Sequence, residues 1–259
     1  MNPLSTLFTI ARNTFREAVR DRVLYNLVFF VLLITAAAVF LGELTAGNEA
    51  RVIVNLGLTA ILLFGAFIAI FVGVGLVSKE IERRTVFAIF SKPVTRSQFV
   101  IGKYLGLCVT LLVNIAVMAL GITLALLYVG GNEFIGSAMV AILLIYLELI
   151  LLTAIAILFS TFSSPTLSTL LTLLIFIIGH FSMALMQIAQ STGSGSIKVF
   201  FNALYYFLPN LSFFSFITNA AHGEMPAFSY LAMALGYALT YVFILLTLAS
   251  FIFGRRNFK

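Results

Sequence analysis

The chain has 259 residues, of which 62% are hydrophobic and 9% are charged. Soluble domains carry close to a quarter charged residues, so this composition excludes an ordinary soluble protein. Apolar runs of 20 or more residues recur, whereas the strands of membrane barrels alternate at every second residue. The fold class is therefore predicted to be an all-α integral membrane protein. The single cysteine, Cys108, excludes an internal disulfide and a thiolate metal cluster.

The net charge of +6 does not indicate nucleic-acid binding, because the cations cluster at the ends of apolar runs. Residues 1–22 precede the first such run and are predicted to form an amphipathic helix in the membrane interface. Apolar residues recur there at steps of three and four, and cations occupy the other face. A simpler interpretation, a basic anchor that only sets topology, uses the same residues.

Six segments are predicted to cross the membrane, because each has at least about 20 residues and spans a core of about 30 Å. They cover roughly residues 23–42, 52–77, 104–129, 135–159, 166–188 and 228–253. The loop at 189–227 contains an apolar run that is too short to cross and that ends at Pro209. We expect this loop to lie outside, with short re-entrant helices packed against the last two spans.

The cations predict which side each loop faces. Four precede the first span, six lie in residues 78–103 and three follow the last span, so these regions hold 13 of the 15 Lys and Arg residues. The positive-inside rule therefore places both termini and residues 78–103 in the cytoplasm. An even number of spans agrees with this assignment.

Residues 78–103 contain two acidic residues as well as the six cations. Residues 80–90 are predicted to form a short helix that Ser78 could cap and Pro93 ends, before the chain re-enters the membrane. Such a charged helix between two spans could dock on a soluble partner. A loop that merely holds topology is the alternative, although topology requires neither the acidic pair nor the proline.

Three polar residues are expected inside the spans. Glu148 lies about 16 Å from the cytoplasmic end of its span, at 1.5 Å per residue. Asn114 lies at a similar depth and His180 somewhat deeper. Because a charge at this depth is costly, Glu148 is expected to be protonated or paired. The three residues could line a substrate or proton path, or they could form hydrogen bonds between helices.

The order of these features resembles the ABC-2 type permeases over the whole chain, including the short six-span kind that serves nitrous oxide reductase maturation. The resemblance rests on the amphipathic N-terminal helix, the span pattern and three motifs, which are Glu80-x-Glu82-x-x-Thr85, Pro93-Val-Thr-Arg96 and Gly102-Lys103. One departure is Arg84, where the family usually has glycine.

The resemblance implies a permease subunit of an ATP-binding-cassette exporter in a prokaryotic inner membrane, with an unidentified substrate. A second permease subunit, identical or homologous, would complete a dimer. Two copies of a separate ATPase subunit would bind the ATP and Mg. The residues implied in the ATPase contact, on a coupling helix, are Glu80, Glu82, Arg83, Arg84, Thr85 and Phe87.

No catalytic, cofactor-binding or metal-binding residue is predicted in this chain. Gly102-Lys103 lacks both the earlier glycine and the following Ser or Thr of a phosphate-binding loop. Three alternatives stay open, which are an ion-coupled secondary transporter or channel, an intramembrane enzyme built around His180, and a membrane anchor without transport.

Overall fold

The computed structural model describes residues 3–20, 47–82, 94–182 and 208–255, together with a few single positions such as Leu32, Ala36 and Phe40. In these residues every regular element is a helix, which confirms the predicted all-α class. The elements are α1 (Pro3–Arg20), α3 (Glu49–Phe67), the π-helical turn η1 (Ile68–Val72), α4 (Gly73–Glu82), α6 (Arg96–Tyr128), η2 (Asn132–Phe134), α7 (Ile135–Phe162), α8 (Pro165–His180), η3 (Leu211–Phe214), α11 (Ile217–Ala221) and α12 (Phe228–Arg255).

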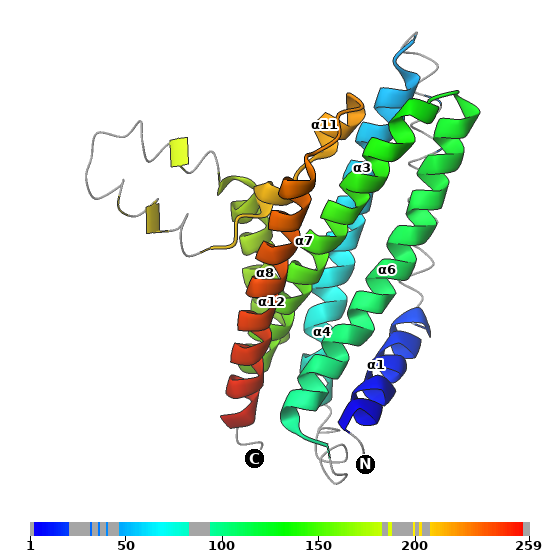
Figure 1. Ribbon diagram of the computed structural model, residues 1–259. Coiled ribbons are helices and arrows are strands. Elements are labelled where there is room, and N and C mark those ends of the chain that lie inside the picture. Colours follow the sequence, from blue (N-terminus) through cyan, green and yellow to red (C-terminus); the bar gives the residue numbers. More distant parts are fainter. Residues whose placement is uncertain are drawn as a thin grey trace.

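The long helices stand side by side as one upright bundle, with α1 beside the first part of α6 (Figure 1). In the described part of the chain, four helices are long and apolar enough to cross a membrane: Glu49–Glu80, Arg96–Tyr128, Asn132–Phe162 and Phe228–Arg255. The first of these is a continuous rod made of α3, η1 and α4. A shorter apolar helix, α8, lies beside them.

The count of six spans stays a prediction. Most of residues 23–42 lie outside the described residues, although Leu32, Ala36 and Phe40 are helical. The continuous helix α8 covers 16 residues of the expected fifth span and ends at His180. Beyond it, Ser182 and residues 186–187 are again helical.

The core of the bundle forms around α7, which packs against α3, α4, α6, α8 and α12. In the most apolar stretch of the α7 span, 78% of the residues are buried inside the bundle, whereas in that of α12 the share is 17%. Glycines bring the α3–α4 rod close to α7. A Cβ atom at Gly65 would collide with Leu149, and one at Gly73 would lie 3.1 Å from the Cβ of Ala156. The π-helical turn η1 lies between these two contacts.

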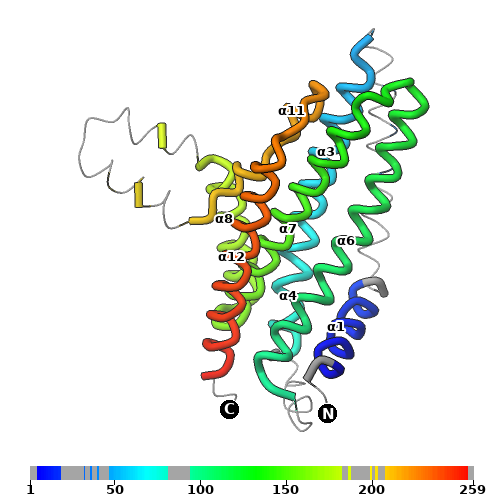
Figure 2. The backbone as a smooth tube through the Cα atoms, in the orientation of Figure 1, coloured from blue at the N-terminus to red at the C-terminus, as the bar shows by residue number. Residues whose placement is uncertain are grey.

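The tube in Figure 2 follows the path of the chain through the bundle. The segment before α12 folds back onto the other end of the bundle from α1. There α11 packs against α3 and α7, whereas η3 packs nearer the middle of the bundle, against α7 and the last turn of α8. The side chains of Leu211 and Phe214 in η3 are fully buried. The segment is therefore packed on the bundle at two levels, with η3 beside the end of α8 and α11 at the end of α3 and α7.

Candidate functional site

The first candidate site is the end of the bundle where α4 ends, α6 begins and α12 ends. Thr95 caps α6, because its hydroxyl accepts the backbone N–H of Gln98 and its own N–H donates to the Gln98 side chain. The Arg96 guanidinium donates to the carbonyl oxygens of Phe253 and Gly254 at 3.1 and 2.8 Å. These carbonyls lie in the last turn of α12, where a cation is favourable. The start of α6 is thus fixed to the end of α12.

Lys103 joins three helices at this end. Its Nζ lies 3.3 Å from Glu17 Oε2 on α1 and 3.3 Å from Glu80 Oε1 on α4. The Lys103 side chain is 7% exposed, and a buried cation is strongly unfavourable without such partners. The ammonium group therefore requires both α1 and α4 to be in place.

Two glycines of α6 provide the seat of α1. A Cβ atom at Gly102 would lie 2.7 Å from Ile10 Cγ2, and one at Gly106 would lie 2.5 Å from Thr14 Cβ. Small residues four apart let helices approach in this way. As a result Thr14 and Ala18 are buried, whereas Phe8 stays 70% exposed. The amphipathic helix α1 is thus docked on α6 with one face and exposed on the other.

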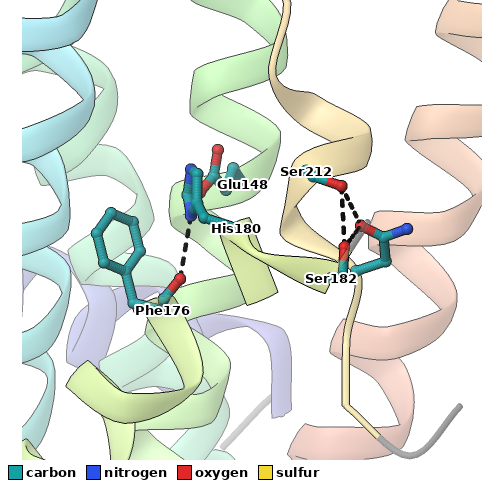
Figure 3. Close-up of polar contacts among 6 residues, drawn as sticks. Glu148, Phe176, His180, Ser182 and Ser212 are labelled. Carbon is teal, nitrogen blue, oxygen red and sulfur yellow. Dashed lines mark hydrogen bonds and ion pairs between the residues drawn. The ribbon is translucent and has the colours of Figure 1, made fainter. Parts of the chain in front are cut away.

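The second candidate site is a polar pair in the middle of the bundle (Figure 3). Glu148, about 20 Å from either end of α7 at 1.5 Å per residue, meets His180 in the last turn of α8. Glu148 Oε1 and His180 Nε2 are 3.3 Å apart, and the Glu148 side chain is 1% exposed. The other ring nitrogen of His180, Nδ1, lies 3.0 Å from the carbonyl oxygen of Phe176.

Asn114 is buried in α6, as its predicted depth implies. Its side-chain N–H donates to the carbonyl oxygen of Thr110, one turn earlier on the same helix. Its amide oxygen has no hydrogen-bond partner among the described residues. The structure therefore brings Glu148 and His180 together, whereas the side-chain hydrogen bond of Asn114 stays within α6.

A third polar cluster holds the segment before α12 and was not predicted from the sequence. Asn210 Oδ1 accepts the hydroxyl groups of Ser182 and Ser212 at 2.5 and 2.6 Å (Figure 3). The backbone N–H of Asn210 donates to the hydroxyl of Tyr237 on α12. The hydroxyl of Tyr230 donates to the carbonyl oxygen of Phe213. These satisfied hydrogen bonds give the cluster a structural role.

Comparison with known families decides what kind of membrane protein this bundle is. A family described as ABC-2 family transporter protein matches residues 8–258, which is almost the whole chain. The chain belongs to this family. It is therefore a multi-pass membrane component of an ABC transporter. Among curated proteins, no match to the chain was found.

In this ABC-2 transporter the predicted ATPase-contact residues begin, in the sequence, at the three-helix junction around Lys103. Glu80 lies within α4, and its carboxylate turns to Lys103. Glu82 ends α4, but its side chain lies outside the described residues. So do the other predicted contact residues, which are Arg83, Arg84, Thr85 and Phe87. Their role in an ATPase contact stays a prediction.

One detail of the expected coupling helix is wrong. Ser78 does not begin a new helix, because α4 runs without a break to Glu82. The Ser78 hydroxyl instead donates to the carbonyl oxygen of Val74, one turn earlier. The transmembrane rod therefore continues directly into the predicted coupling segment.

Sequence reasoning also missed the roles of Arg96 and Lys103 in this ABC-2 transporter. Both were counted as cations that set topology, whereas the structure gives them specific partners in other helices. A signal was present, since Lys103 follows Gly102 in a stretch that is otherwise apolar on both sides. A cation at such a position needs a buried acidic partner.

Proposed function

We propose that this chain is the permease subunit of an ABC exporter whose ATP is hydrolysed by a separate ATPase subunit. Two permease subunits, identical or homologous, would surround the transport path, and two ATPase subunits would dock beneath them. ATP and Mg²⁺ would bind to the ATPase and not to this chain. The substrate class is left open.

The observation that carries this proposal is the way both ends of residues 78–103 are anchored. The first end leaves α4 next to Glu80, which pairs with Lys103. The second end enters α6 at Thr95 and Arg96, and Arg96 binds the end of α12. A loop that only sets topology needs no such frame.

This frame supports a mechanical role for the segment between its ends. Because packed protein interiors resist compression, a push on residues 83–93 would pass into α4 and α6 rather than be absorbed. Through Lys103 and Arg96 the same push would reach α1 and α12. We therefore infer that the closing ATPase subunits act on the permease through this segment.

The orientation follows from the same proposal. Residues 83–93 and both termini would lie in the cytoplasm of a prokaryotic cell, since the ATPase needs cytoplasmic ATP. The described cations Lys79, Arg96, Lys103 and Arg255 lie at this end of the bundle, and the positive-inside rule supports the assignment.

The test is a double charge reversal in the proposed contact, Glu82→Lys with Arg83→Glu. The matched control is Glu49→Lys with Arg51→Glu, which reverses one acid and one cation at the other end of the same helical rod. Each tagged variant is purified in mild detergent from its native host. The bound ATPase subunit and its ATP hydrolysis are then measured.

We expect both variants to reach the membrane in equal amount. The variant at Glu82 and Arg83 should lose the bound ATPase or its coupling to transport, whereas the control should keep both. A fully active ATPase complex from the contact variant would contradict the proposal.

A further inference from the structure

We propose that the contact between Glu148 and His180 is a binding site for one proton, which the carboxylate and the imidazole share between α7 and α8. This site is independent of the proposed ATPase partner. It can therefore be tested on the purified chain alone.

The contact of His180 with the backbone fixes which ring nitrogen carries hydrogen. Nδ1 lies 3.0 Å from the carbonyl oxygen of Phe176, and a carbonyl oxygen only accepts hydrogen bonds. Nδ1 therefore holds a proton. In a neutral imidazole the other nitrogen, Nε2, then has only a lone pair, and this is the atom that faces Glu148.

The number of protons in the contact follows from this tautomer. Without a further proton, an anionic carboxylate would face a lone pair at 3.3 Å, so two acceptors would meet without a donor. With two further protons, an imidazolium would face a neutral acid, and a net positive charge would be buried. With one proton the pair is neutral and one group donates to the other. A site inside a bundle disfavours net charge, so it selects the state with one proton.

Among the described residues, no donor other than His180 lies at hydrogen-bonding distance from the Glu148 carboxylate. Neither of its carboxylate oxygens has a hydrogen-bond partner among the described residues, and the side chain is 1% exposed. The shared proton is what gives the buried carboxylate a partner.

The other titratable groups on elements that pack against α7 have partners or positions elsewhere. Glu80 and Lys103 pair with each other, and the Tyr230 hydroxyl donates to a carbonyl oxygen. Of the groups that the structure describes on those elements, His180 forms the ion-pair contact with Glu148. The remaining ones are Glu49, Arg51, Lys79, Arg96, Tyr104, Cys108, Tyr128, Glu133, Tyr237, Tyr241 and Arg255. On α7 itself, the Tyr146 hydroxyl donates to the carbonyl oxygen of Cys108.

The proton has a structural consequence because α8 is held by few buried groups. Its buried residues are Ser168, Thr172 and Gly179, and its large apolar side chains are mostly exposed. Proton release would leave an anion against a lone pair, and we infer that α8 would then loosen from α7.

The tautomer can be measured by nitrogen NMR on the full chain labelled in its imidazole rings. The chain has two histidines, so the variant His222→Gln leaves His180 as the single signal source. His222 is exposed and lies outside the site. We expect a protonated Nδ1 and an Nε2 signal displaced by the shared proton. Glu148→Gln should keep Nδ1 protonated, because its amide N–H donates to Nε2. Glu148→Ala should shift the Nε2 signal to that of a free lone pair.

A proton found on Nε2 with none on Nδ1 would overturn the proposal. Identical ring signals in the parent and in Glu148→Ala would overturn it as well. Neither result would bear on whether an ATPase drives the transporter.

A thermal-unfolding cycle provides a second measurement. Glu148→Ala and His180→Ala should each lower the melting temperature, and the double variant should melt no lower than the worse single variant, because the pair acts as a unit. Fully additive shifts would show that the two side chains do not share a proton.

Discussion

Replacement of Gly106 by alanine tests the seat of α1 on α6 most directly. A Cβ atom at this position would lie 2.5 Å from Thr14 Cβ and 2.6 Å from the carbonyl oxygen of Ala11. Both distances are far shorter than a van der Waals contact. The nearest atoms belong to the backbone or stand directly on it, so no side-chain rotation can relieve the clash. The helix α1 must move away.

The matched control is Gly236→Ala on α12, where no atom lies within 4 Å of the added Cβ. Both substitutions gain about 1 kcal/mol of helix propensity, so this term cancels between them. What remains is the cost of overpacking at Gly106, about 1–3 kcal/mol. For a chain of this size each kcal/mol shifts Tm by about 2–4 °C. Gly106→Ala should therefore melt at least about 2 °C below Gly236→Ala.

The assay is thermal unfolding of the two purified variants in the same detergent, followed by circular dichroism. Equal melting temperatures, or a more stable Gly106→Ala, would refute the close packing of α1 on α6. Such a result would also contradict the contact between Lys103 and Glu17, because that contact needs α1 in place.

Three further changes test individual contacts by the same thermal assay. Lys103→Met should destabilise the fold by about 1 kcal/mol because Glu17 and Glu80 lose the cation that they share. Glu80→Gln added to it should restore part of the loss, because one of the two carboxylates is then neutral; no restoration would contradict the pairing. Arg96→Ala should lower the free energy of unfolding by about 1 kcal/mol, because the last carbonyl groups of α12 lose their hydrogen-bond donor. An unchanged Tm would show that Arg96 does not stabilise the end of α12. Tyr230→Phe should lower the free energy of unfolding by about 1 kcal/mol, because the hydrogen bond of its hydroxyl is lost. The control, Tyr128→Phe at an exposed position, should leave the stability unchanged. Equal effects of the two variants would count against the contact of Tyr230.

The sequence predicted the class of this protein because composition and run length are local properties. The period of the apolar residues indicated a helix before the first span, and the structure has α1 over Pro3–Arg20. The apolar run at 104–129 lies in α6 except for its last residue, and the run at 135–159 lies within α7. The helices extend beyond these apolar runs into polar residues, because an apolar run marks only the part of a helix that lies in lipid or in the protein core.

The sequence could not predict which helices meet. Arg96 binds carbonyls 157 and 158 residues away, and Lys103 pairs with an acid 86 residues earlier. Helical periodicity names the buried face of a helix but not its neighbour. Position along a span indicated how deep Glu148 and His180 lie. Their pairing was not predicted, because it depends on which helices are neighbours.

The π-helical turn η1 sets the register between two neighbouring rods. Gly65 and Gly73 are eight residues apart, yet their partners on α7, Leu149 and Ala156, are seven apart. Eight residues of regular α-helix would turn the second glycine about 80° away from the first. The additional residue that a π turn accommodates brings it back into line. Without this turn, a regular α-helix with the same number of residues would rotate everything beyond it by about 100°, so a single backbone position in mid-membrane decides whether the acidic end of this rod can meet its cation.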